Sequence, residues 1–286
     1  MPRAMREEIS LTYKKFEHAK REAKKNTKAS KKAEREAEKA KKKEEDEAKK
    51  AKREAEKAKK KEEDEAKKAA ADAKAAHAKR AYDVISALPG VAPILKDLRV
   101  YKWLYGDTSF LEGRTLKDRE AAESAWGEEL KQLLSTPTDA SWTGPVGEYI
   151  AVALLAVAGK TVHPKKRYYH YVPSDKRTIL SDGELDDYVL EVKSQTYFTP
   201  GTAGDKIPTV ARKYAWVPRV SGKNVWVICL GKAEQIARTY RLFADPTAPE
   251  EDKAYQALDA RFNIDYLAGT DLLAMAMSAI PTPVPL

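Results

Sequence analysis

Cysteine is almost missing from this chain of 286 residues, because Cys229 is its only thiol. A single cysteine excludes an intramolecular disulfide framework and fits a reducing compartment. With only four histidines beside it, the sequence also lacks a convincing zinc site. The longest apolar run, 150–158, is far shorter than the roughly 20 residues that span a bilayer, and the first residues have no apolar core of a signal peptide. We therefore expect a soluble, cytoplasmic protein with no membrane partner.

Glycine and proline are absent from residues 7–81, which consist almost entirely of Lys, Glu, Arg and Ala. These are strong helix formers. The segment that begins at Arg35 recurs at Arg53, and this period of 18 residues equals five turns of an α-helix. Its only apolar stripe is alanine, which is too small to fill the layers of a coiled coil well. The pattern favours a lone charged helical arm over an oligomerising coil.

The net charge of +9 is unevenly distributed. Residues 1–80 hold 29 basic and 18 acidic side chains, whereas residues 81–286 hold 24 basic and 26 acidic ones. A basic surplus suits polyanionic partners such as nucleic acid, although a Lys-rich helix also carries it for solubility alone. The rest of the chain is near neutral, so it would have to bind a polyanion through local basic patches.

The pattern divides the chain into four parts. The charged arm covers 1–81, a helical region 82–140, an α/β core 141–245, and a C-terminal helical segment with a Pro-rich tail 246–286. Hydrophobic periodicity in the core predicts a helix, three strands, a helix, a strand and a helix, which is a mixed sheet flanked by helices. The expected helices in and before the core cover 81–98, 117–134, 146–158, 204–214 and 232–243, and the expected strands cover 160–171, 177–185, 188–196 and 224–230.

Charged side chains interrupt an apolar strand at the centre of this core. Side chains alternate faces along a strand, so Glu191, Lys193 and Gln195 share one face of 188–196. An acid, a base and an amide in an apolar strand cost stability unless they are paired or exposed. The preceding strand forms a hairpin with this one, which places Asp182 beside Glu191.

Two neighbouring carboxylates repel each other, and a divalent cation relieves that repulsion. Oxygen ligands suit Mg²⁺, and Mn²⁺ as well. We expect Asp182, Glu191 and the backbone carbonyl of Val192 to hold the metal, with Glu148 as an additional carboxylate. Lys193 would orient a metal-activated water and offset transition-state charge, while Gln195 would hydrogen-bond the water or a phosphate.

Plainer interpretations stay open for several of these residues. Asp182 precedes Gly183 as a turn residue often does, and Asp186 and Asp187 compete with it as metal ligands. Glu148 is also explained as an acidic residue near a helix amino terminus. A basic segment with interleaved tyrosines either grips nucleic-acid phosphates and bases or forms a solvated strand edge; it comprises Lys165, Lys166, Arg167, Tyr168, Tyr169 and Tyr171.

The spacing Asp182…Glu191-Val-Lys193, the upstream Glu148 and the order of elements resemble the PD-(D/E)XK nuclease superfamily. The segment 195–207, followed by Lys213-Tyr214, further resembles a group of type II restriction endonucleases. The resemblance covers residues 144–243, and Ser181 stands where the pattern expects proline.

It implies a restriction-endonuclease-like fold and a Mg²⁺-dependent endodeoxyribonuclease that cuts double-stranded DNA, as a homodimer whose two sites cut two strands. A repair or recombination nuclease, a nuclease toxin and a non-catalytic DNA-binding scaffold remain alternatives.

Overall fold

The computed structural model divides by internal contacts into two compact units, Met1–Ala69 and Ala70–Leu286. The composition places the end of the charged arm at residue 81, whereas the first unit ends at Ala69. Residues 70–81 of the charged segment therefore belong to the second unit. The first copy of the 18-residue repeat lies largely outside the described residues, as does the end of the Pro-rich tail. The structure describes residues 21–22, 41–43, 49–50, 52–136, 138–172, 175–199, 206–245 and 260–281.

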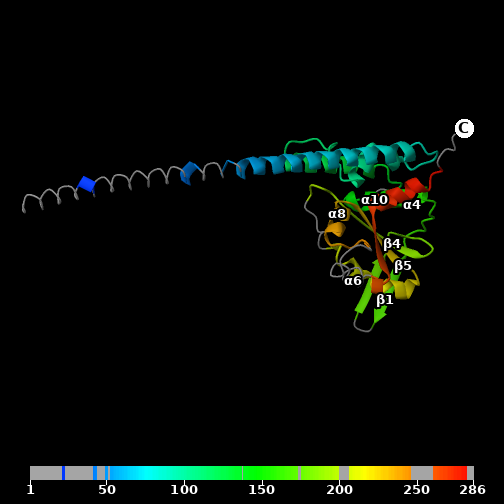
Figure 1. Ribbon diagram of the computed structural model, residues 1–286. Coiled ribbons are helices and arrows are strands. Elements are labelled where there is room, and N and C mark those ends of the chain that lie inside the picture. Colours follow the sequence, from blue (N-terminus) through cyan, green and yellow to red (C-terminus); the bar gives the residue numbers. More distant parts are fainter. Residues whose placement is uncertain are drawn as a thin grey trace, which may run out of the picture. The chain divides into compact units, whose positions relative to one another are not determined.

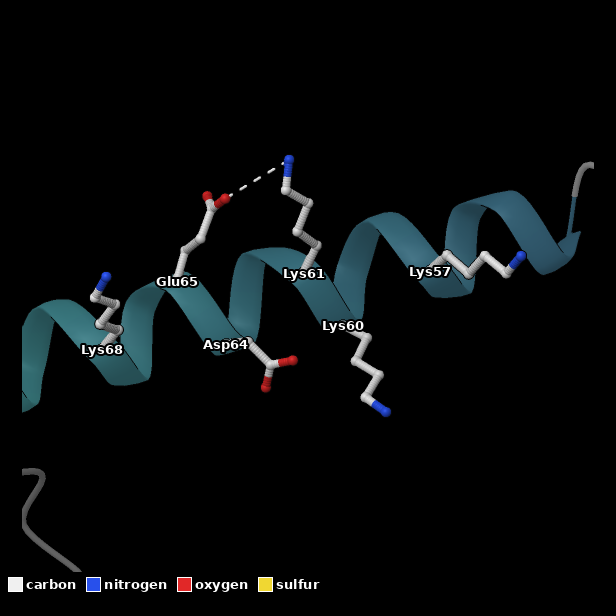
Figure 2. A pocket seen from close by; sticks show the side chains of 6 residues that line it. All are labelled: Lys57, Lys60, Lys61, Asp64, Glu65 and Lys68. Carbon is white, nitrogen blue, oxygen red and sulfur yellow. Dashed lines mark ion pairs between the residues drawn. The ribbon is translucent and has the colours of Figure 1, made fainter.

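The described end of the first unit, 52–69, is an α-helix whose residues are all exposed, in agreement with the predicted charged arm. Its only described side-chain ion pair joins Lys61 Nζ to Glu65 at 3.7 Å. Figure 2 shows that the side chains between Lys57 and Lys68 project outward from one helix, so the hollow among them is an open surface groove. An exposed pair of this kind contributes little stability.

The second unit begins with helical residues 70–85, whose inner face carries the buried Ala78, Ala81 and Ile85. We expected a helix over 81–98, and that prediction was wrong beyond residue 85. Pro89 and Gly90 interrupt the helix, since proline lacks the backbone donor and Gly90 has a φ of +72°. The chain then forms the 3₁₀-helix η1 (Pro93–Lys96) and helix α2 (Leu98–Leu104).

Helix α3 (Leu116–Lys131) matches the helix expected over 117–134. A capping box starts it, because the Thr115 hydroxyl accepts from the Asp118 N–H and the Asp118 carboxylate accepts from the Thr115 N–H. Its buried Glu123 carboxylate accepts hydrogen bonds from Trp103 Nε1 at 3.0 Å and from the N–H of Tyr197 at 2.9 Å. The helical region therefore anchors the segment that follows the central strand.

A four-stranded mixed sheet forms the centre of the described second unit, in the order β3-β4-β5-β6. Its strands are β3 (Gly183–Glu184), β4 (Tyr188–Gln195), β5 (Asn224–Gly231) and β6 (Ile264–Ala268). Strand β3 pairs antiparallel with β4, and the other two pairs are parallel. Strand β4 is thus an interior strand, as the apolar flanks of Glu191 and Lys193 predicted.

Helices cover both faces of this sheet (Figure 1). One core contains residues of α4 (Thr143–Val157) and α10 (Gly269–Ser278). The other core contains residues of α6 (Val210–Tyr214), α7 (Val217–Ser221) and α8 (Lys232–Thr239). The predicted mixed α/β architecture is confirmed at this level, with a long charged helix before it. None of the helices in the described ranges combines the length and apolar character that crossing a membrane requires.

The strand expected over 177–185 is divided in the structure, which corrects that prediction. Strands β1 (Arg167–Val172) and β2 (Asp175–Leu180) form a separate two-stranded antiparallel ribbon, and only β3 pairs with β4. The change of partner occurs within one peptide unit. Ser181 N–H donates to Lys166 O and continues the ribbon, whereas Asp182 N–H donates to Leu190 O and joins the sheet. The turn predicted at Asp186 and Asp187 is present between β3 and β4.

Strand β6 extends the sheet past residue 245, where the sequence pattern had ended the core. We expected only helix and tail after that point, and the parallel pairing of β6 with β5 shows the difference. A five-residue strand is too short to show a clear period. Helix α8 also ends earlier than the predicted 243, because Arg241 adopts a left-handed φ of 54°.

Candidate active site

Strand β4 carries the predicted alternation. Glu191 is 3% exposed and faces the core that contains Tyr214, while Leu190 and Val192 lie in the core that contains α4. Ser194 also contacts α4, because its hydroxyl donates to Thr143 O at 2.5 Å. The polar face of the strand was therefore predicted correctly from its sequence.

Both oxygens of the Glu191 carboxylate have partners within the protein. Lys193 Nζ binds Oε1, and the Tyr214 hydroxyl donates to Oε2. Burial and the charge of Glu191 raise the pKa of Tyr214, so this hydroxyl keeps its proton and remains a donor. The sequence indicated Tyr214 only through the resemblance to restriction endonucleases. Its contact with Glu191 depends on how α6 packs across β4, which the sequence pattern does not show.

Asp182 lies at the start of the hairpin, beside Glu191. Its Oδ2 accepts from the Val192 N–H at 2.7 Å. Burial, together with the nearby charge of Glu191, raises the pKa of Asp182 to about 7, although the Val192 hydrogen bond opposes the change. Two neighbouring carboxylates that are largely shielded from solvent attract a cation or a proton.

Glu148 reaches the same cluster from α4. Lys165 Nζ binds its Oε2 and lies 4.0 Å from Asp182 Oδ1, so one ammonium group serves two carboxylates. Lys166 fixes the backbone next to this lysine, because its N–H donates to Ser181 Oγ at 2.9 Å. From the sequence we expected Lys165 either to grip phosphates or to lie on a solvated strand edge, and we did not predict its contacts with the carboxylate cluster.

Gln195 and Val192 complete the set of predicted residues. Gln195 is 6% exposed, and its Oε1 is buried without a hydrogen-bond partner in the described part of the chain. The Val192 N–H holds Asp182, and the metal contact that we expected from its carbonyl stays a prediction.

The competing aspartates lie elsewhere. The Asp186 side chain is 91% exposed in the hairpin turn, 3.3 Å from His163 Nε2. Asp187 is exposed in the same turn. The geometry thus brings Asp182, and neither turn residue, next to Glu191.

The donor set can be compared with the needs of a divalent cation. Within the described ranges, no three His, Cys, Asp or Glu side chains are placed so that they hold one metal ion together. The chemistry of the cluster nevertheless fits Mg²⁺ or Mn²⁺, since its donors are carboxylate oxygens. Lys165 and Lys193 already supply positive charge to the same carboxylates, and the pKa of Asp182 is nevertheless raised, chiefly by burial and then by the charge of Glu191.

Comparison with known proteins adds no family to this description. No family model matches the chain, and neither the curated proteins nor the solved structures contain a significant match.

Proposed function

We propose that this chain is a metal-dependent endonuclease that hydrolyses phosphodiester bonds in double-stranded DNA. The observation that carries the proposal is the pair of neighbouring carboxylates Asp182, which directly precedes β3, and the buried Glu191 of β4, with Lys193 bound to Glu191. The resemblance to PD-(D/E)XK nucleases rests on the same residues. On this basis, we propose that the mixed sheet is a restriction-endonuclease-like fold.

Each residue of the carboxylate cluster has its own proposed role in hydrolysis. Asp182 and Glu191 would hold Mg²⁺, with the Val192 carbonyl and Glu148 as further donors. When bound, such a cation polarises a phosphate and lowers the pKa of a bound water. Lys193 would orient such a water and stabilise negative charge on the transition state. The Gln195 amide offers its unpaired Oε1 to the water.

Glu148 takes part only if Lys165 releases it, because the two are ion-paired. The freed ammonium group would then lie next to the metal ligands, where it supports binding of the scissile phosphate. Lys165 thus has two successive roles in this proposal, first neutralising the carboxylates and then holding the substrate.

One observation favours a second candidate, a DNA-binding scaffold without catalysis. Lys193 and Tyr214 occupy both oxygens of Glu191, which is also how a buried carboxylate is stabilised for structural reasons alone.

Plasmid cleavage distinguishes the two candidates. Purified protein is incubated with supercoiled plasmid and Mg²⁺ or Mn²⁺, alongside Asp182→Asn, Lys193→Gln and the control Asp186→Asn. We expect the first two variants to lose roughly a hundred-fold or more in rate, whereas the exposed Asp186 is dispensable. Discrete fragments indicate a restriction-type enzyme, and a smear indicates a repair nuclease or a toxin. No cleavage with either metal, or full activity in both site variants, contradicts the catalytic proposal.

A further inference from the structure

Positive charge in the second part of the chain is concentrated in two segments. Residues 81–286 hold 24 basic and 26 acidic side chains. Of these, segments 165–180 and 206–223 contain ten basic residues and one acidic residue, so they carry a net charge of +9. The remainder of 81–286 then has 14 basic and 25 acidic residues, a net charge of −11. Such a separation is typical of a surface that binds a polyanion.

The fold brings the two segments together. Helix α7 packs against strand β1, and the rings of His170 and Trp216 lie 5.1 Å apart. Below them, Tyr168 and Ile179 of the ribbon share one hydrophobic core with Val217 of α7. The ribbon and the two helices are therefore neighbouring elements, and we name the basic surface as the exposed residues of the β1–β2 ribbon together with those of 206–221.

The basic surface exposes cations beside apolar groups. On the ribbon, Tyr168 and Ile179 point into the core, and the opposite face shows Arg167, Tyr169 and Leu180. Arg167 pairs across the strands with Leu180, and Tyr169 and Leu180 are 46% and 45% exposed. Exposed basic side chains also lie on the helices, at Arg212 and Lys213 of α6 and Arg219 of α7, and Lys206 is exposed ahead of α6.

The basic surface also borders the candidate active site from two directions. At the ribbon, Lys165 precedes β1 and contacts Glu148 and Asp182. At the helices, Tyr214 donates to Glu191 directly next to the exposed Lys213. A polymer that lies on this surface is thus adjacent to the carboxylate cluster.

We propose that the basic surface is where a DNA duplex binds. Arg167, Arg212, Lys213 and Arg219 contact phosphates, which position a duplex without specifying its sequence. The major groove of B-DNA admits a two-stranded ribbon, so β1 and β2 lie along a groove. The choice of duplex DNA as the polyanion rests on the proposed function, whereas the location of the surface rests on charge and packing.

The test measures binding of the full chain to a short fluorescein-labelled DNA duplex by fluorescence anisotropy. EDTA is present throughout, so neither metal binding nor cleavage affects the result. The variant Arg167→Ala/Arg212→Ala/Arg219→Ala is compared with Lys96→Ala/Arg114→Ala/Lys117→Ala, which removes three exposed charges from the helical region instead. The arm is unchanged in both variants, so its own contribution to binding cancels. Circular dichroism confirms that each variant is folded.

We expect the basic-surface variant to bind about ten-fold more weakly or worse between roughly 50 and 200 mM salt, with a salt slope lower by about 0.9 for each lost phosphate contact. The control variant keeps the wild-type affinity and slope. Equal affinity of the two variants overturns the proposal, whether both match the wild type or both are weakened.

The outcomes separate this inference from the proposed function. A chain that cleaves plasmid but binds DNA equally well after loss of the three arginines keeps its enzymatic function and loses the basic surface as its DNA site. A chain that never cleaves but loses binding keeps the basic surface and fits the scaffold candidate.

Discussion

The fold raises the pKa of the Asp182 carboxyl group well above its ordinary value. It lies mostly shielded from solvent beside Glu191, and the Val192 N–H and Lys193 favour its charged form. Active sites commonly contain groups with perturbed pKa values of this kind. The raised pKa predicts how the stability of the protein depends on pH, whether or not the protein is an enzyme.

Asp182→Asn should stabilise the metal-free protein at high pH. The folded-state pKa of about 7 is above the ordinary 3.8, so the folded state holds the proton more tightly than the unfolded state does. Stability from this residue is full below pH 3.8 and is lost as the pH rises through about 7. At about 1.36 kcal/mol per pKa unit, the loss is on the order of a few kcal/mol.

Thermal unfolding in EDTA at about pH 5 and about pH 8 checks the expectation. The melting temperature of Asp182→Asn should gain on that of the wild type as the pH rises, whereas the exposed Asp186→Asn tracks the wild type. A constant difference across this range would show that Asp182 is not strained by its charge.

Tyr214 is expected to position Glu191. Tyr214→Phe leaves Glu191 Oε2 without its hydrogen bond, and bonds to charged groups contribute about 1.5–3 kcal/mol. If the chain cleaves DNA, the Mg²⁺ concentration for half-maximal cleavage should therefore increase roughly ten-fold. The effect arises from orientation, since phenylalanine preserves the ring that packs in the core.

Tyr168→Phe is the matched control, because Tyr168 donates in the same way to Glu184, which lies outside the carboxylate cluster. We expect that variant to lose stability without changing its metal requirement. Parallel changes in both variants would reduce Tyr214 to a structural role.

At the scale of elements, the contact of α4 with β4 determines where Glu148 lies. Gly147 packs so closely that an added Cβ would lie 2.4 Å from Ser194 Oγ, whereas a Cβ at Gly144 meets nothing within 4 Å. Gly147→Ala should cost about 1–3 kcal/mol through overpacking. Gly144→Ala should be neutral or stabilise by up to about 1 kcal/mol, since alanine favours the helix.

Denaturant unfolding of the two variants gives the comparison directly. If the chain cleaves DNA, the Gly147→Ala variant should also cleave more slowly than its loss of stability explains, because Glu148 follows Gly147. Equal stability of the two variants would mean that α4 moves away from β4 at little cost.

The elements also show what the sequence could and could not predict. Alternation along β4 correctly placed Glu191, Lys193 and Gln195 on one face, because that pattern is local. The contact of Tyr214 with Glu191 was not predictable, since it joins residues across a helix packing. The division of 177–185 into β2 and β3 likewise depends on the partners of Ser181 and Asp182, which lie in different strands.

At the scale of the whole molecule, Met1–Ala69 of the charged arm form a compact unit of their own. Its described residues 52–69 are all exposed and bury no apolar surface. Deleting residues 1–69 should therefore shift the melting temperature of the remaining chain by no more than about 2 °C. Analytical ultracentrifugation of the full and shortened chains tests the coiled-coil alternative at the same time. Loss of a dimer together with the arm would show that the arm oligomerises.

The junction between Ser181 and Asp182 has a mechanical consequence. One peptide unit separates the last backbone pairing of the ribbon from the first pairing of the sheet, and Lys165 spans the two through its contact with Asp182. No loop separates the ribbon, which would contact a long polymer, from Asp182, whose carboxylate would take part in hydrolysing that polymer. A displacement of the ribbon would therefore move the backbone next to Asp182, so the position of a duplex bound at the ribbon and the position of this carboxylate would be coupled.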